Sequence, residues 1–208
     1  MNMTGKASGM PLQGEGAEGT GSRRGKLKIF FSYASGTGKT YAMLQGAHQA
    51  AERGVDVAVG FAELRGCPQM SGPLKELEQI PAKYPEFDLD AALRRRPELI
   101  LVGGFAHRNA PGSRHTSRYQ DIQELLDAGI HVYTTMNVQH LESLNDTVSA
   151  IAGIQVEERI PDLVFDQADQ VELVDLEPAE LLERLAAENP AGQPIAGFFT
   201  LENLTALR

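Results

Sequence analysis

The segment SYASGTGKT, residues 32–40, combines glycines, a lysine and a threonine at a spacing that suits phosphate binding. Its two glycines allow consecutive backbone N–H groups to converge on an anion, because glycine adopts the positive φ angles that such a turn requires. The lysine can reach the outer phosphates of a nucleotide, and the last hydroxyl can ligate Mg²⁺. The sequence therefore predicts a phosphate-binding loop made of Ser35, Gly36, Thr37, Gly38, Lys39 and Thr40, with Thr40 as the residue that meets the metal.

The start of this loop departs from the strict phosphate-loop pattern. That pattern has a glycine five residues before Gly38, and this chain has Tyr33 there. A tyrosine rarely adopts a positive φ angle, so we expect the loop to begin with a different turn while residues 35–40 keep their anion-binding shape. The alternative is a glycine-rich turn with an incidental lysine, but the intact G-x-G-K-T between a strand and a helix favours phosphate binding.

The acids that hydrolysis would need are not where they are expected. Hydrolysis requires one group that orients Mg²⁺ and another that positions the attacking water. The apolar segment LILVGG ends in Gly103 and Gly104, where an acid is expected. Glu63 is the remaining candidate for a catalytic acid, although a solvated loop glutamate would have the same context. The sequence therefore favours nucleotide binding without hydrolysis.

The segment AHRNAPGSRHTSRYQD, residues 106–121, is rich in arginine and histidine. A basic loop of this kind can close over phosphates, and a guanidinium suits that role because it forms paired hydrogen bonds. We expect Arg114 or Arg118 to make the contact and take Arg114 as the candidate ligand. The alternative is a solvated loop whose charge serves solubility.

The composition limits the possible functions. With 208 residues and a net charge of −9, the chain lacks the positive charge that general nucleic-acid binding requires. No apolar run reaches the roughly 18 residues needed to cross a bilayer, so we expect no membrane insertion. The single cysteine, Cys67, excludes an internal disulfide and fits a reducing cytoplasm. Residues 1–24 carry few large apolar side chains, and we expect a disordered leader, either natural or added for expression.

The rest of the chain alternates between strand-like and helix-like segments. Apolar, β-rich runs cover residues 26–31, 55–63, 98–104, 130–136 and 170–175, and helical patterns cover 38–54, 88–96, 118–129 and 137–153, the last with Asn137 as its cap. This alternation predicts an α/β fold: a P-loop NTPase-like three-layer sandwich around a mainly parallel sheet of five or slightly more strands. We assign residues 25–208 to one nucleotide-binding domain, whose last helical segment, about 196–208, leads towards further domains.

From Gly25 onwards the chain resembles the N-terminal cytoplasmic domain of the KdpD family, membrane sensor histidine kinases that control a potassium-transport operon. The resemblance rests on long specific runs, above all NAPGSRH at 109–115 and NVQHLESLND at 137–146. It implies that the loop binds ATP or a related nucleotide with Mg²⁺ through Gly36, Gly38, Lys39 and Thr40. It also implies a two-component system, a cytoplasmic position beside the inner membrane, and other cytoplasmic domains of the same kinase as partners. The chain has no phospho-acceptor histidine box, so we do not expect catalysis by this piece alone.

The departures from the family pattern leave three functional hypotheses. A family sequence like LVDELAH is LVGGFAH here, and the family's first loop glycine is absent. The favoured hypothesis is a regulatory module that binds nucleotide without turning it over. The alternatives are a weak NTPase that uses Glu63, and a protein-interaction domain in which nucleotide binding has decayed.

Overall fold

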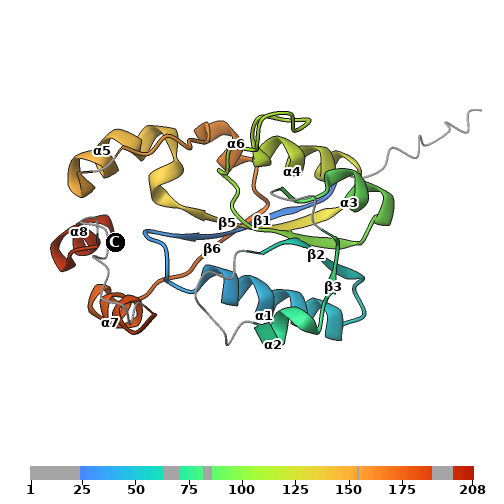
Figure 1. Cartoon of the computed structure of the whole chain (residues 1–208), viewed down its shortest axis with the longest axis horizontal. Helices are drawn as coiled ribbons and strands as arrows, with labels where there is room; N and C mark the ends of the chain where they lie inside the picture. Colours follow the sequence, from blue (N-terminus) through green and yellow to red (C-terminus); the bar gives the residue numbers. More distant parts are fainter. Residues whose placement is uncertain (1–23, 63–70, 82–85, 154, 189–198) are drawn as a thin grey trace, which may run out of the picture.

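The computed structural model of the chain describes residues 24–62, 71–81, 86–153, 155–188 and 199–208. They form an α/β fold around a six-stranded sheet with the spatial order β3-β2-β4-β5-β1-β6 (Figure 1). All pairings between these strands are parallel. The strands are β1 (Leu27–Ser32), β2 (Val57–Phe61), β3 (Glu78–Gln79), β4 (Leu99–Val102), β5 (His131–Asn137) and β6 (Gln170–Leu173). The predicted fold class is confirmed, and the two-residue strand β3 adds to the five strands expected from the sequence.

Helices cover both faces of the sheet and complete three layers (Figure 1). Helices α1 and α2 pack on one face, and α3, α4 and α6 pack on the other. The helices are α1 (Lys39–Glu52), α2 (Ser71–Lys75), α3 (Leu89–Arg95), α4 (Arg118–Asp127), α5 (Glu142–Ala152), α6 (Asp162–Asp166), α7 (Pro178–Glu188) and α8 (Leu201–Leu207). None of the helices in the described residues is both long enough and apolar enough to cross a membrane.

The central strand β1 shows why both faces must be covered. Its neighbouring residues Ile29 and Phe30 are both fully buried, yet they belong to apolar clusters on opposite sides of the sheet. Successive side chains of a strand point to opposite faces, so a strand with apolar side chains on both faces needs a helix layer on each side. Burying each of these side chains contributes about 1.5–3 kcal/mol to stability.

The segment 137–153 is not the single helix that its spacing predicts. A 3₁₀ turn, Val138–His140, is followed by extended Leu141, and α5 begins only at Glu142. Leu141 is buried and forms a parallel bridge with Ile160, whose N–H bonds the His140 carbonyl at 2.7 Å. This tertiary pairing outweighs the local helical preference. Asn137 therefore does not cap a helix with its side chain, and the prediction of that cap is wrong.

Several helices lie outside the predicted set. Helices α2, α6 and α7 were not expected, whereas α8 lies inside the helical segment predicted for residues 196–208. The predicted leader falls almost wholly on residues 1–23, and Glu63 falls in 63–70; both ranges lie outside the described residues. The predictions for the leader and for Glu63 therefore stay predictions.

Candidate functional site

The loop between β1 and α1 has the backbone shape of an anion-binding turn. Gly36 and Gly38 have φ angles of 89° and 100°, in the left-handed region that glycine adopts without strain. Thr37 between them is buried. Alternation of left-handed and right-handed residues curls the backbone so that successive N–H groups face one concave side. The loop also opens into the N-terminus of α1, where the partial positive charge of the helix adds to an anion's attraction.

The Lys39 side chain folds back over this loop. Its Nζ donates to the Ala34 carbonyl at 2.7 Å and to Thr37 Oγ1 at 3.4 Å. The residue is only 9% exposed. Burying an ammonium group costs free energy unless it is hydrogen-bonded, and the loop supplies two acceptors. The lysine charge is thus held inside the curve of the backbone, which is the position from which it can meet a phosphate oxygen.

Tyr33 replaces the first glycine of the strict pattern without a left-handed turn. Among the described residues, Arg96 is the only non-glycine residue with a positive φ angle, so Tyr33 turns by another route, as expected from its type. Its ring is buried and its hydroxyl donates to the Leu176 carbonyl at 2.7 Å. Burial, followed by the charge of Asp175, raises the pKa of the Tyr33 hydroxyl above its usual value. The tyrosine therefore anchors the start of the loop to the segment after β6.

Asn137, at the end of β5, connects the neighbouring strand to the loop. Its Nδ2 donates to Ser35 Oγ at 3.0 Å, and the residue is 8% exposed. Its Oδ1 is buried and has no hydrogen-bond partner. A buried acceptor without a donor costs about 1–3 kcal/mol, so such atoms commonly mark a place for water or ligand. An orphaned acceptor beside Ser35 fits a hydrated Mg²⁺–nucleotide in the loop.

The end of β4 has two glycines in place of carboxylates. A Cβ atom added to Gly103 would lie 3.6 Å from the Phe61 carbonyl and 3.6 Å from Thr135 Oγ1, which are ordinary contacts. Gly104 has a φ angle of 75°, so a larger residue would be strained there. Because β5 lies between β4 and β1, this end is two strands from the loop, on the order of 10 Å. Within the residues that the structure describes, no group of three or more His, Cys, Asp or Glu side chains is placed to hold a metal.

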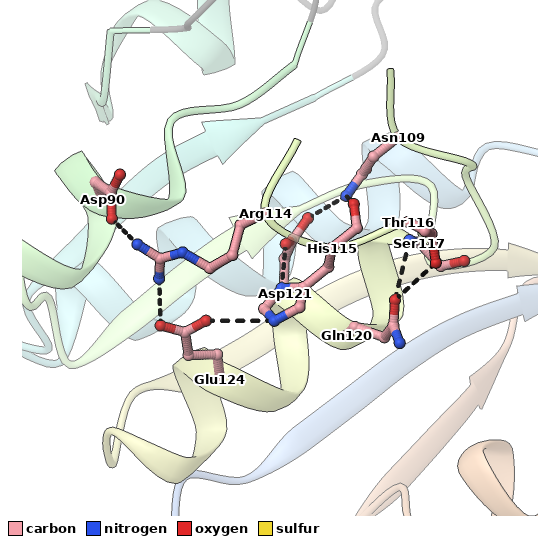
Figure 2. A network of polar contacts seen from close by, with 9 residues as sticks. All are labelled: Asp90, Asn109, Arg114, His115, Thr116, Ser117, Gln120, Asp121 and Glu124. Carbon is pink, nitrogen blue, oxygen red and sulfur yellow. Dashed lines mark hydrogen bonds and ion pairs between the residues drawn. The ribbon is translucent and has the colours of Figure 1, made fainter. Parts of the chain in front are cut away.

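The basic segment after β4 is neutralised by neighbouring acids. Arg114 pairs with Asp90 of α3 and with Glu124 of α4 (Figure 2). His115 Nδ1 lies 2.7 Å from Asp121 Oδ1 (Figure 2). Asp121 is on the same face of α4 as Glu124. The structure thus engages Arg114 with two carboxylates on this side of the sheet. Its contact with a nucleotide stays a prediction.

Arg118, the other arginine considered for phosphate binding, is fully buried. Its Nη2 pairs with Glu86 Oε2 at 2.7 Å, its Nη1 donates to the Gly103 carbonyl at 3.0 Å, and its guanidinium lies 4.3 Å from the centre of the Phe61 ring. Burial raises the pKa of Glu86, but hydrogen bonds from His107, Arg118 and the Ala110 N–H outweigh it and leave the pKa below its ordinary value. Arg118 therefore holds the backbone at the end of β4 in place.

The sequence reasoning assigned no part in the loop to two residues that lie near it. Its only role for Asn137 is that of a helix cap, although the residue ends β5, at the carboxyl edge of the sheet where ligands bind in such folds. Arg184 belongs to α7, which was not predicted, and its Nη1 donates to the Gly36 carbonyl at 3.3 Å. The leucine spacing in residues 181–185 was the signal available for that helix.

Comparison with known proteins assigns the chain to one family. The family model described as "KdpD: Osmosensitive K+ channel His kinase sensor domain" matches residues 23–208. The Sensor protein KdpD of Escherichia coli (strain K12) is 52% identical over 198 residues, which cover 89% of this chain and 22% of that protein. The Sensor protein KdpD of Clostridium acetobutylicum is 51% identical over 198 residues, with 89% and 22% covered. That of Mycobacterium tuberculosis (strain H37Rv) is 46% identical over 200 residues, with 90% and 23% covered. The chain therefore spans less than a quarter of the length of these relatives.

Proposed function

The chain belongs to the KdpD family of osmosensitive K⁺-channel histidine kinase sensor domains, and on that basis we propose that it is a nucleotide-binding regulatory domain. In the proposed role it reports the nucleotide state to a membrane sensor kinase of a two-component system that controls potassium transport. The domain would act on the cytoplasmic side, where ATP is available. Other cytoplasmic domains of the same kinase would receive the signal.

The observation that carries this proposal is the curl of the loop around the Lys39 ammonium. Gly36 and Gly38 take up left-handed conformations, and Lys39 Nζ lies 2.7 Å from the Ala34 carbonyl inside the curve. Phosphate oxygens are the ligands that such a nest and a lysine charge recognise together. Residues 35–40 would hold the phosphates of ATP, and the Thr40 hydroxyl would meet the Mg²⁺ that balances their charge.

Binding without turnover is the form of this function that the site supports best. Transition-state charge on a transferring phosphoryl group has to be met by placed acids, metal and water-positioning groups. The end of β4 supplies Gly103 and Gly104 instead of acids. Turnover by a weak NTPase would depend on Glu63. That alternative would be favoured if the protein releases phosphate steadily from ATP and Glu63→Gln abolishes the release.

A nucleotide titration followed by thermal unfolding tests the proposal. Ligand at 100 times its Kd stabilises a fold by ~2.7 kcal/mol, which raises the Tm of a domain this size by roughly 5–11 °C. We expect this shift with ATP or ADP in the presence of Mg²⁺, and we expect Lys39→Ala to remove it. Lys75→Ala, in α2, is the matched lysine control. A melting temperature unchanged by every nucleotide, with and without Mg²⁺, would reject the function.

A second candidate function is a protein-interaction domain that no longer uses nucleotide. The edge strand β6 favours it, because Val171 and Leu173 are 44% and 68% exposed on a strand that pairs on one side with β1. Exposed apolar residues on an unpaired sheet edge are typical of surfaces that add a partner strand. Binding of another cytoplasmic domain of the kinase that neither ATP nor Lys39→Ala changes would support this candidate.

A further inference from the structure

Helix α7 lies directly against the phosphate loop. Figure 1 shows it beyond the end of β1, next to the start of α1. A Cβ atom added to Gly36 would lie 3.1 Å from Leu181 Cδ1 and 3.1 Å from Leu185 Cδ2. Leu181 is fully buried in an apolar cluster with Tyr33 and Ala34 from the start of the loop. The helix is therefore in van der Waals contact with the backbone that curls around the anion site.

Arg184 is carried on the same face of α7 as these two leucines. Residues 181, 184 and 185 are three and four positions apart, so their side chains share one side of the helix. Arg184 Nη1 donates to the Gly36 carbonyl at 3.3 Å and lies 3.5 Å from the position of a Cβ on Gly38. Its charge is thus placed beside the two left-handed glycines.

The hydrogen bond from Arg184 to Gly36 is a weak one for a guanidinium. At 3.3 Å it is longer than the usual 2.7–3.2 Å, and its acceptor is a neutral carbonyl. Charge-assisted bonds to phosphate are shorter and roughly twice as strong, and a guanidinium can form two of them in parallel. Phosphate oxygens held between Gly36 and Gly38 would offer Arg184 a better partner within a small rotation of its side chain.

We propose that Arg184 is a further nucleotide-binding residue, which contacts the polyphosphate from α7 and thereby tightens this helix on the occupied loop. The inference rests on the proposed nucleotide-binding function and adds a second cation to the site. The helix would then respond to the occupant of the loop, because the residue that meets the phosphate and the leucines that meet Gly36 belong to the same rigid element. A purely structural role, in which Arg184 only fastens α7 to the loop, makes different predictions.

Nucleotide affinity and apo stability, measured on the same variants, separate the two roles. We expect Arg184→Ala to weaken ATP binding in calorimetric titrations by roughly tenfold, as for one solvent-accessible charge-assisted hydrogen bond. The Tm of its apo form should change by less than about 2 °C, since the bond that it loses is long and exposed. The ATP affinity of Arg184→Lys should lie between that of Arg184→Ala and that of the unaltered protein. Arg94→Ala, which removes an exposed arginine of α3, should match the unaltered protein in both measurements.

The salt dependence of ATP affinity separates the two roles further, because a purely structural role of Arg184 would leave it unchanged. The ATP affinity of Arg184→Ala should fall less steeply with added salt than that of the unaltered protein, because one screened charge pair is missing. If Arg184→Ala lowers the apo Tm strongly, the comparison of salt slopes is made with Arg184→Lys and Arg184→Gln. Equal affinity and equal salt slope in the Arg184 variants and the unaltered protein would overturn the role of Arg184 alone. No binding of ATP by the unaltered protein would overturn the proposed function as well.

Discussion

Asn137 and Ser35 connect the neighbouring strands β5 and β1 at their carboxyl ends, where the phosphate loop begins. The Asn137 amide Nδ2 lies 3.0 Å from Ser35 Oγ, while its Oδ1 is buried without a partner. The amide is held on one side and leaves its acceptor available on the other. Such half-satisfied groups are unfavourable in the empty fold and become favourable when a donor arrives.

Replacing Asn137 should therefore lower the affinity for nucleotide more than it lowers the free energy of unfolding. We expect Asn137→Ala to lower the affinity for Mg²⁺–ATP roughly three- to tenfold, because one or two hydrogen bonds are lost. The free energy of unfolding without nucleotide should change little, since the orphaned acceptor leaves together with the bond to Ser35. Calorimetric titration and chemical denaturation measure the two quantities.

Asn145 is the control for this experiment. It is also buried, but its Nδ2 donates to the Gln139 carbonyl at 3.1 Å and to the Val156 carbonyl at 3.2 Å. Asn145→Ala should lower the free energy of unfolding by about 1–3 kcal/mol and leave the affinity of the folded protein unchanged. If the two variants behave alike, Asn137 has no special link to the ligand.

Restoring an acid at the end of β4 should strengthen the dependence on magnesium. A Cβ atom at Gly103 would make only ordinary contacts and the residue does not have a positive φ angle, so we expect Gly103→Asp to keep the fold. A carboxylate at this end of the sheet can hold Mg²⁺ or one of its waters, so the ratio of ATP affinities with and without Mg²⁺ should rise. Gly103→Asn, of nearly the same shape without the charge, should not raise it. An unchanged ratio in Gly103→Asp would show that this edge does not face the metal.

Sequence reasoning succeeds here where the signal is local. The left-handed turn between β1 and α1 could be predicted because Gly36, Gly38 and Lys39 lie within four consecutive residues. The parallel sheet could be predicted because apolar strand-like runs alternate with helical patterns. Sequence reasoning failed at Leu141, because the extended bridge to Ile160 is a tertiary contact that competes with helical spacing. The packing of α7 on Gly36 joins segments almost 150 positions apart, and no periodicity within either segment encodes it.

Packing of α7 on the loop can be measured through Gly36. Gly36→Ala combines an unfavourable φ angle of 89° with Cβ contacts of 3.1 Å to Leu181 and Leu185. Gly54 has a similar φ angle of 86° but nothing within 4 Å of its Cβ position. Gly54→Ala should cost about 1–2 kcal/mol for the backbone alone. Gly36→Ala should cost about 1–3 kcal/mol more, since a tightly packed site resists an added methyl group. If urea denaturation shows equal losses in the free energy of unfolding for Gly36→Ala and Gly54→Ala, α7 moves away from the loop without cost.

The ion pair between buried Arg118 and part-buried Glu86 should contribute to the acid stability of the domain. The pKa of Glu86 lies below its ordinary value of 4.5 in the folded chain, so the carboxylate stabilises the fold at neutral pH. This contribution is fully present above the unfolded pKa and is lost as the pH falls through the folded pKa. We therefore expect the free energy of unfolding to decline as the pH falls from about 4.5.

Removing the carboxylate tests this assignment. Glu86→Gln removes the negative charge that pairs with the fully buried Arg118 guanidinium, which should lower the free energy of unfolding at pH 7 by about 3 kcal/mol. The variant should also lose part of the decline below pH 4.5, because the group that titrates is gone. Asp127→Asn breaks the exposed pair with Arg24 and should cost less than about 1 kcal/mol. If the free energy of unfolding of Glu86→Gln falls with pH in parallel with that of the unaltered protein, other carboxylates cause the acid sensitivity. In that case the contacts of Arg118 with the Gly103 carbonyl and the Phe61 ring would be enough to hold its side chain.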